Sequence, residues 1–520
     1  MASKRYPLGI QTFSEIVKGN YFYADKTAIV YQLAHYAKFH FLSRPRRFGK
    51  SLFVSTLQAY FEGKKELFKG LAIEKMEEEW TAYPVIHLDL SCGKYYSLEN
   101  TKIILNNILE IEEQKYGIKI QEYEREGFGA RLKNILLAAT AQTGKQVVVL
   151  IDEYDAPMHD SVSDGDLQKT IRNIMRDFFS PLKHQEGNIR FVFITGISKF
   201  SQLSIFSELN NLKILTLKDE YSGCCGITKS ELTQYFREGI EEMAEHNDLT
   251  YEETLEQLKQ HYDGYHFSIH SEDVFNPYSI INALDDKEFN SYWFSSGTPT
   301  FLIELMQQKN LDMLNLNDLW IKDDRFDAPT EKLTDPIPVL FQSGYLTIKG
   351  YEKRGKLYHL CFPNQEVRQG FSESLVRYYS AEDMNKYDTI VYAYSRNVLI
   401  GDDMAAFMPH LKAFYDKFPY TIINNNERHY QAVMFTIFTM LGEDVRVEHA
   451  TSDGRIDLLL KTEQSIFIFE LKYKKTADTA MTQISSKDYA KAFADDGRKV
   501  VKVGINFSED QRSIEDWTIE

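Results

Sequence analysis

The segment Phe41-Leu-Ser-Arg-Pro-Arg-Arg-Phe-Gly-Lys-Ser-Leu-Phe53 separates an apolar stretch from a helix-like stretch, and it predicts a phosphate-binding loop. Such a loop requires backbone N–H groups around the phosphates, a lysine that reaches the terminal phosphates and a hydroxyl that binds Mg²⁺, all at a helix N-terminus. Gly49, Lys50 and Ser51 supply these parts. The sequence therefore predicts a binding site for a nucleoside triphosphate.

The loop differs from the signature G-x-x-x-x-G-K-[ST] at its first position, where the chain has Arg44 instead of glycine. The turn at Arg44-Pro45 is therefore expected to form without a residue that readily adopts positive φ. The loop residues that we expect to surround the nucleotide are Arg44, Arg47, Phe48, Gly49, Lys50 and Ser51.

A second segment, Gln146-Val-Val-Val-Leu-Ile-Asp-Glu-Tyr-Asp155, is an apolar run that ends in acidic residues, as a buried parallel strand does at its carboxyl end. We expect Asp152 and Ser51 to hold Mg²⁺, and Glu153 to polarise the attacking water. The alternative is an ordinary buried strand followed by solvated acids. The lysine loop in the same chain favours the nucleotide site.

Strands and helices alternate in the first part of the chain, which predicts an α/β fold with a parallel sheet. The expected strands cover residues 39–43, 85–90, 146–151, 189–195 and 213–217. Thr195 and Ser198 end the fourth strand, where a polar sensor could lie beside the attacking water. A local hydrogen bond to the backbone is an equally good role for either hydroxyl.

The segment Tyr21-Phe-Tyr-Ala-Asp-Lys-Thr27 precedes a helix-like stretch. Asp25 or Thr27 could cap this helix, and the nearby aromatic residues could pack on adenine. Together with residues 44–51 and 151–155, its second half, residues 23–27, resembles the bacterial AAA-ATPase-like family. The resemblance implies that Arg44 is a family trait, and that a P-loop NTPase sheet is followed by a helical, winged-helix-like lid and a PD-(D/E)XK nuclease-like domain.

Two apolar segments near the C-terminus, residues 453–461 and 465–472, are separated by a short polar turn. Glu470 and Lys472 are two residues apart and would share one face of a strand. Asp457 and Glu470 could bind Mg²⁺, while Lys472 orients the nucleophile. These roles are the ones that the nuclease resemblance implies.

The same resemblance gives further positions of this domain a role. Glu427 opens an amphipathic helix and matches the acid of the first helix, and Gln483 and Tyr489 match a supporting motif. The chain departs from the name-giving motif because Arg-Ile precedes Asp457, where proline is expected nearby. The alternative for the whole cluster is a hairpin edge with solvated charges.

The 520 residues, 43% of them hydrophobic, can bury several cores. We expect an ATPase-like domain at 1–225, a helical lid and connecting region at 226–400, and a nuclease-like domain at 401–520. A capping box from Thr228 to Glu231 marks the start of the helical region.

The net charge of -16 argues against a generally basic surface that coats nucleic acid, so a contact with DNA must be local. Lys472, Lys474 and Lys475 form one such basic cluster. The four cysteines lack zinc-site spacing, which predicts reduced thiols. No apolar run reaches the roughly 18 residues that a membrane span needs, so we expect a cytoplasmic protein without a membrane contact.

These observations predict a protein that binds and hydrolyses ATP, with Mg²⁺, and that regulates a magnesium-dependent nuclease acting on DNA. The alternative is a nucleotide-switched signalling or interaction protein whose nuclease-like domain only binds a nucleic acid or a partner. Arg172 and Arg176, four residues apart on an expected helix, could contact phosphates across a subunit boundary of a homo-oligomer. Solvated helical arginines are the simpler alternative.

Overall fold

The computed structural model divides the chain into two compact units. The first contains residues 1–293 and 320–364, and the second contains residues 294–319 and 365–520. The structure describes residues 4–119, 127–161, 164–198, 206, 209, 211–294, 302–303, 306, 311, 313–326, 335–379, 384–416, 426–452, 454–510 and 512–520. Asp453 of the C-terminal motif lies outside the described residues.

A five-stranded parallel sheet forms the centre of the first unit, with the order β2-β3-β4-β1-β5. Its strands are β1 (Phe39–Ser43), β2 (Val85–Asp89), β3 (Val147–Asp152), β4 (Ile189–Gly196) and β5 (Lys213–Ile214). The sheet confirms the predicted α/β fold. The last strand, at the edge of the sheet, is shorter than expected, and among the described strands it pairs with β1 alone.

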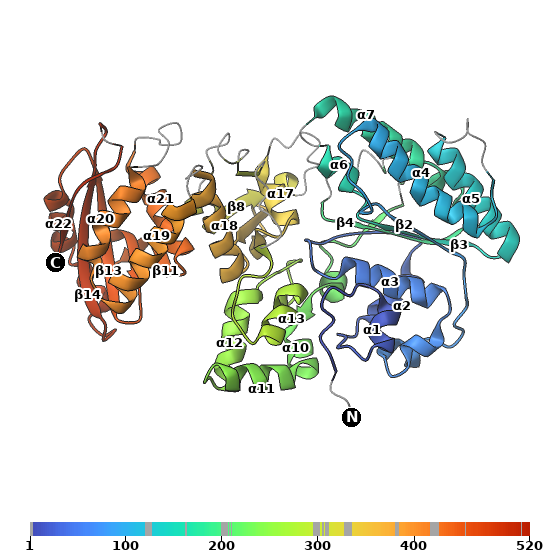
Figure 1. Ribbon diagram of the computed structural model, residues 1–520, viewed down its shortest axis with the longest axis horizontal. Helices are drawn as coiled ribbons and strands as arrows, with labels where there is room; N and C mark the ends of the chain where they lie inside the picture. Colours follow the sequence, from blue (N-terminus) through green and yellow to red (C-terminus); the bar gives the residue numbers. More distant parts are fainter. Residues whose placement is uncertain are drawn as a thin grey trace. The chain divides into compact units, whose positions relative to one another are not determined.

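Helices cover both faces of this sheet (Figure 1). One face carries α1 (Phe13–Lys18), α2 (Thr27–Tyr36) and α3 (Lys50–Phe61). The other face carries α4 (Leu98–Lys115), α5 (Phe128–Thr143) and α7 (Gly165–Phe179). The interior strand β3 is buried along its whole length, as its unbroken apolar sequence requires when both faces are covered. Because β1 and β3 both run parallel to β4, their carboxyl ends lie at the same edge of the sheet.

A helical region follows the parallel sheet. Its elements are β6 (Ile227–Thr228), α10 (Lys229–Tyr235), α11 (Arg237–His246), α12 (Tyr251–Tyr262), β7 (Val274–Phe275) and α13 (Pro277–Asp286). The predicted capping box is confirmed: the Thr228 side chain accepts from the Glu231 N–H, and the Glu231 carboxylate accepts from the Thr228 N–H. A small core that includes Leu232, Ile240 and Leu258 holds these helices together.

The first unit ends in a three-stranded sheet with the order β8-β10-β9. Its strands are β8 (Leu319–Lys322), β9 (Thr347–Glu352) and β10 (Leu357–Cys361), accompanied by the short helices α16 (Asp323–Phe326) and α17 (Pro336–Gln342). Strands β9 and β10 form an antiparallel hairpin.

The second unit has a mixed sheet of five strands in the order β11-β12-β13-β14-β15. Its strands are β11 (Asp444–Thr451), β12 (Gly454–Lys461), β13 (Ser465–Tyr473), β14 (Lys499–Phe507) and β15 (Ile514–Ile519). Its helices are α15 (Met313–Asn317), α18 (Gln365–Tyr379), α19 (Met384–Tyr394), α20 (Met404–Tyr415), α21 (Glu427–Met440) and α22 (Ala477–Ser486). Helix α21 packs on β11, β12 and β13, while α22 packs on β13, β14 and β15. This second α/β sheet confirms the expected fold of the C-terminal part.

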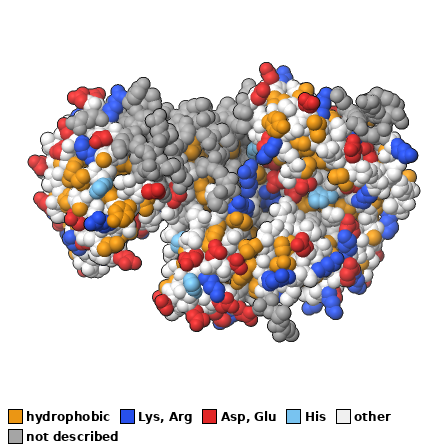
Figure 2. Space-filling view, viewed as in Figure 1, with side chains coloured by type: hydrophobic (Ala, Val, Ile, Leu, Met, Phe, Trp, Pro, Cys, Tyr) orange, Lys and Arg blue, Asp and Glu red, His pale blue; other side chains and the backbone are white. Residues whose placement is uncertain are grey.

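Acidic and basic side chains are interspersed over the described surface that Figure 2 shows, which agrees with the expectation that no general basic surface exists. Within the described part of the chain, no helix has the length and apolar character needed to cross a bilayer. The four cysteines, Cys92, Cys224, Cys225 and Cys361, are free thiols, as expected.

Candidate nucleotide and nuclease sites

The loop between β1 and α3 has the backbone of a phosphate-binding turn. Gly49 is the N-cap of α3 and has a φ of 83°, so the helix begins at Lys50. Arg47 has a φ of 66°. The sequence offered no residue suited to positive φ near Arg44-Pro45, and the structure places this conformation at Arg47, three residues later. A non-glycine residue adopts it only at a cost, which its surroundings must offset.

Arg44 is buried and its guanidinium is used inside the protein. Nη1 donates to the carbonyl oxygens of Ser43 and Thr216, both at 2.9 Å, and Nη2 donates to that of Tyr221 at 3.0 Å. The guanidinium also lies 4.2 Å from the ring centre of Phe267. The side chain expected to face the nucleotide therefore fastens the loop to the region after β5 and to the helical region.

Arg47 and Phe48 fasten the loop on its other side. The Arg47 guanidinium lies 3.8 Å from the ring centre of Tyr278 and donates to the Tyr292 carbonyl at 3.1 Å. The Phe48 ring packs edge-on against Tyr265, with ring centres 4.7 Å apart. These contacts account for the strained φ at Arg47, because they hold that residue in one conformation.

Lys50 and Glu153 meet at the carboxyl edge of the sheet. The Lys50 Nζ lies 3.1 Å from Glu153 Oε1, and it donates to the carbonyl oxygens of Arg44 and Pro45, both at 3.2 Å. Glu153 has a φ of 48°, in the left-handed region. The predicted phosphate-binding lysine and the predicted water-polarising acid therefore form an ion pair.

Asp152 and Ser51, the predicted Mg²⁺ ligands, are joined by a side-chain hydrogen bond. Burial and the neighbouring Glu153 raise the pKa of Asp152 to about 6, although Ser51 and Lys50 act in the opposite direction. A buried carboxylate beside a hydroxyl at the end of a central strand suits a hard divalent cation. A cation would remove the cause of this shift, because it stabilises the charged carboxylate.

Asp155 holds the loop after β3 against the end of β4. Its Oδ2 accepts from the Ser198 N–H at 2.7 Å and from the Ser198 hydroxyl at 2.8 Å, and it lies 3.0 Å from His159 Nε2. Burial raises the pKa of Asp155, but His159 and Ser198 outweigh it and hold that pKa below its ordinary value. The Thr195 hydroxyl donates to the Leu42 carbonyl at 2.8 Å, which is the local backbone bond that the sequence left open.

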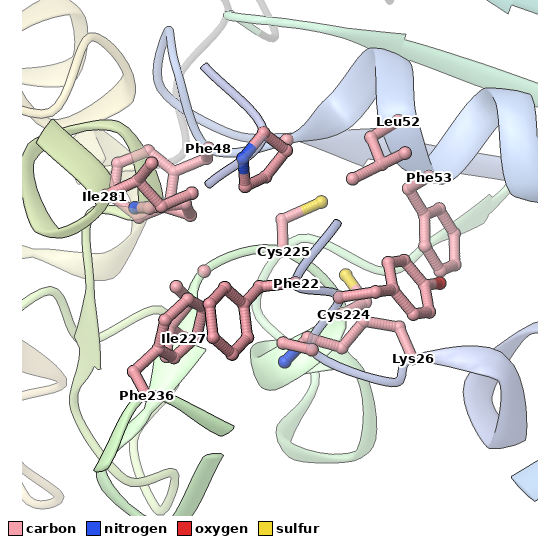
Figure 3. Close-up of a pocket in the computed structure, with 16 residues that line it drawn as sticks. Phe22, Lys26, Phe48, Leu52, Phe53, Cys224, Cys225, Ile227, Phe236 and Ile281 are labelled. Carbon is pink, nitrogen blue, oxygen red and sulfur yellow. The ribbon is translucent and has the colours of Figure 1, made fainter. Parts of the chain in front are cut away.

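An apolar pocket lies beside the phosphate-binding loop. Leu52 and Phe53 line one end, Phe22 and Phe236 another, and Cys224 and Cys225 lie between them (Figure 3). Phe22 and Tyr23, part of the aromatic segment expected to pack on adenine, belong to this lining. Asp25 accepts from the Thr27 N–H at 2.9 Å, next to the start of α2. The pocket has the apolar walls that a nucleobase requires.

The C-terminal cluster lies on β12 and β13. Lys472 Nζ donates to Glu470 Oε1 at 2.8 Å, because residues two apart in a strand share a face. Asp457 Oδ2 accepts from the Leu471 N–H at 2.8 Å, which places it beside Glu470. Burial and the neighbouring Asp457 raise the pKa of Glu470 to about 7.

Glu470 has one unused acceptor. Its side chain is fully buried, and Oε2 has no donor partner among the described residues, although the Asp457 carboxyl lies within hydrogen-bonding range of the Glu470 side chain. A buried, unsatisfied carboxylate oxygen is costly unless a ligand completes it. A group of three metal-binding side chains was not found in the described part of the chain, so Asp457 and Glu470 would need water or substrate oxygens to complete a Mg²⁺ shell.

Two segments of the chain match known families. Residues 7–206 match the family described as predicted AAA-ATPase, and residues 425–517 match the PD-(D/E)XK nuclease superfamily. The chain is also 32% identical over 530 residues to a protein of Azotobacter chroococcum mcd 1 described as "Uncharacterized protein in vnfD 5'region", covering 100% of this chain and 99% of that protein. The chain belongs to the AAA-ATPase-like family with a C-terminal PD-(D/E)XK nuclease-like domain. The family expected from the sequence is thus confirmed.

In this AAA-ATPase-like protein, the structure adds residues around the nuclease-like cluster that sequence reasoning missed. Gln431 Nε2 donates to the Asp457 carbonyl at 2.6 Å and to Glu448 Oε1 at 3.1 Å. Gln431 lies one helical turn after Glu427 on α21, so the i,i+4 spacing was the available signal. Glu427 acts electrostatically on both Asp457 and Lys472, so it lies close to the cluster, at the start of α21 as predicted.

The remaining predicted residues of the AAA-ATPase-like protein lie as follows. Tyr489 is buried and shares a hydrogen bond with Gln483, and burial together with the nearby Glu470 charge raises the pKa of Tyr489. Arg172 is half-buried and Arg176 is exposed, both on α7. A contact of these arginines across a subunit boundary stays a prediction.

Proposed function

We propose that the first unit binds and hydrolyses ATP with Mg²⁺, and that this reaction controls a magnesium-dependent nuclease in the second unit that acts on DNA. The observation that carries the first half is the ion pair between Lys50 and Glu153 at the N-terminus of α3. The AAA-ATPase-like family indicates nucleotide binding, and this pair suggests how the nucleotide would act on the protein.

The Lys50 ammonium has three oxygen partners, namely the carbonyls of Arg44 and Pro45 and the Glu153 carboxylate. A triphosphate in the loop offers Lys50 stronger anionic partners. Glu153 would then be released and could orient the water that attacks the terminal phosphate. ATP binding would therefore bring the substrate into the site and also free Glu153 to polarise the attacking water.

Ser51 and Asp152 are the residues that would hold Mg²⁺ beside the phosphates, where the ion would neutralise the charge that develops during transfer. Asp155 would keep the loop that carries Glu153 in position through its bonds to Ser198. The apolar pocket lined by Phe22 and Phe236 would take the base.

The second unit supports a nuclease through Asp457, Glu470 and Lys472. The two carboxylates would hold Mg²⁺, which supplies a water of lowered pKa and stabilises charge on the phosphate. Lys472 is held by Glu470, so its ammonium is positioned beside the metal site and could orient the attacking water. The unsatisfied Oε2 of Glu470 is the observation that favours a ligand at this place.

Calorimetric titration with ATP and Mg²⁺ tests the first half of this proposal. Lys50→Ala should weaken ATP binding at least tenfold, while Lys65→Ala, at an exposed position, should bind like the unchanged protein. Equal affinity of Lys50→Ala and Lys65→Ala would contradict the nucleotide site. Supercoiled plasmid DNA with Mg²⁺ tests the second half, with Glu470→Gln compared with Glu463→Gln in the exposed turn before β13.

The second candidate is a nucleotide-switched binding protein whose nuclease-like domain does not cleave. The pairing of Glu470 with Lys472 favours this candidate. The raised pKa of Glu470 and the adjacent Lys472 ammonium allow the carboxyl group to be buried stably without a metal ion. In that case DNA or partner binding would not depend on Mg²⁺, and Glu470→Gln would leave the affinity unchanged.

A further inference from the structure

We propose that the outer face of the β8-β10-β9 sheet, with the turn between β9 and β10, binds single-stranded nucleic acid. This surface consists of Trp320, Lys322, Lys353, Arg354 and Lys356, and we call it the hairpin surface. It belongs to the first unit and shares no residue with the nucleotide site or the nuclease-like cluster.

Trp320 is an aromatic platform with an open side. Its ring is stacked on His359, with ring centres 4.5 Å apart and planes inclined by only 5°. The side chain nevertheless remains 49% exposed, although a tryptophan of this kind normally covers core. His359 therefore fixes one face of the ring and leaves the other to stack on a base, an interaction that is available to any of the bases.

The cations of the hairpin surface are not used inside the protein. Lys322, Lys353, Arg354 and Lys356 are exposed, and none of them forms an ion pair with another described residue. Elsewhere in the same sheet, by contrast, Lys349 has the Asp273 carboxylate at 3.8 Å. Four exposed cations without an ion pair are available to contact phosphate groups, although the chain has a net charge of -16.

One of the nearby acids has a structural role within the hairpin. Both carboxylate oxygens of Glu352 accept backbone N–H groups of the turn, from Arg354 and Gly355, so that this acid shapes the hairpin. Asp318, Asp323 and Asp324 flank Trp320 and Lys322 in the sequence, and the Asp323 N–H donates to the Lys356 carbonyl at 3.0 Å. That bond also joins the end of β8 to the turn.

The geometry brings the platform and the cations within reach of one short strand of nucleic acid. Lys322 is two residues after Trp320 and shares its face of β8. The distance along the strand from the Trp320–His359 contact to the Asp323–Lys356 bond is three residues, or about 10 Å. A stacked base on Trp320 would therefore place its neighbouring phosphates near Lys322 and the turn.

Fluorescence anisotropy with a labelled oligothymidine of 20 nucleotides tests the proposal, using the full chain in EDTA without nucleotide. These conditions exclude cleavage and ATP hydrolysis, so the result does not depend on the function proposed above. The charge reversal Lys353→Glu, Arg354→Glu, Lys356→Glu should weaken binding at least tenfold. It should also reduce the slope of log affinity against log salt by about 2, since each phosphate contact on a single strand contributes about 0.7.

A matched triple variant, Lys65→Glu, Lys69→Glu, Lys75→Glu, reverses three exposed cations elsewhere in the first unit and should change the affinity less than threefold. Trp320→Ala should weaken binding to the single strand by about fivefold or more, and Trp320→Phe should restore most of it. A 20-base-pair duplex should respond to the charge reversal but not to Trp320→Ala.

Several results would overturn the proposal. One is equal weakening by the two triple variants, and another is equal affinity of Trp320→Ala and the unchanged protein for the single strand. Competition by polyglutamate as effective, charge for charge, as competition by unlabelled oligothymidine would instead identify the hairpin surface as a site for an acidic protein segment.

Discussion

Restoring the glycine that phosphate-binding loops have at the first signature position should damage this protein. The perturbation is Arg44→Gly, which makes residues 44–51 match G-x-x-x-x-G-K-[ST]. A reading of the signature alone predicts an equal or better loop. The structure predicts the opposite, because the Arg44 side chain is 1% exposed and holds the loop in place.

The magnitude follows from what Arg44 contacts. Its guanidinium donates to three carbonyl oxygens and lies over the Phe267 ring. A hydrogen bond from a charged donor contributes about 1.5–3 kcal/mol, a desolvated cation–π contact about 2 kcal/mol, and an added glycine costs about 1 kcal/mol in backbone entropy. Because such terms are not additive, we expect a loss of about 5 kcal/mol in the free energy of unfolding.

Urea unfolding of the full chain measures this loss, and Arg46→Gly is the control. Arg46 is exposed in the same loop, so its replacement adds the glycine entropy without removing buried contacts. Arg46→Gly should lose about 1 kcal/mol. The reasoning would be refuted if the free energies of unfolding of Arg44→Gly and Arg46→Gly differed by no more than about 1 kcal/mol. It would also be refuted if Arg44→Gly bound ATP more tightly than the unchanged protein.

Three further predictions concern the sites. ATP should protect the pocket thiol Cys224 from N-ethylmaleimide, while the exposed Cys92 should react to the same degree with and without ATP, as peptide mass mapping would show. Equal protection of both thiols would contradict binding of the base in the pocket. Asp155→Asn should lower the rate of ATP hydrolysis roughly tenfold or more with little change in ATP affinity, because it misplaces the loop of Glu153; an unchanged rate would remove Asp155 from that role. Burial beside Asp457 raises the folded-state pKa of Glu470 to about 7. The free energy of unfolding therefore falls as the pH rises through this pKa, because the folded state loses a proton that it holds more tightly than the unfolded state. The urea midpoint of the unchanged protein should therefore fall from pH 6 to pH 8 more than that of Glu470→Gln, and Mg²⁺ should reverse the difference.

The fold followed from the sequence where the pattern is local and strong. The apolar run before Asp152 and the loop before Lys50 each define one strand end, and burial on both faces makes such runs unambiguous. The strand spacing of Glu470 and Lys472 likewise predicted their shared face. The division into domains at 225 and 400 stays a prediction.

What the sequence could not provide are contacts between distant segments. Arg44 was expected to face the nucleotide, but its carbonyl partners at 216 and 221 are more than 170 residues away. The positive φ of Arg47 depends on Tyr278, in the helical region. Gln431 follows Glu427 by one helical turn, yet its bond to the Asp457 carbonyl becomes visible only when α21 packs on β12. These roles arise from packing, and one-dimensional patterns do not contain them.

The central claim is that the nucleotide site governs a magnesium-dependent nuclease. Cleavage of supercoiled plasmid and of single-stranded DNA by the full chain with Mg²⁺, with and without ATP, tests it most directly when Lys50→Ala and Glu470→Gln are measured alongside. We predict that Glu470→Gln abolishes cleavage and that Lys50→Ala removes its response to ATP. Cleavage that persists in Glu470→Gln, or that responds to ATP equally in Lys50→Ala and the unchanged protein, would contradict the account.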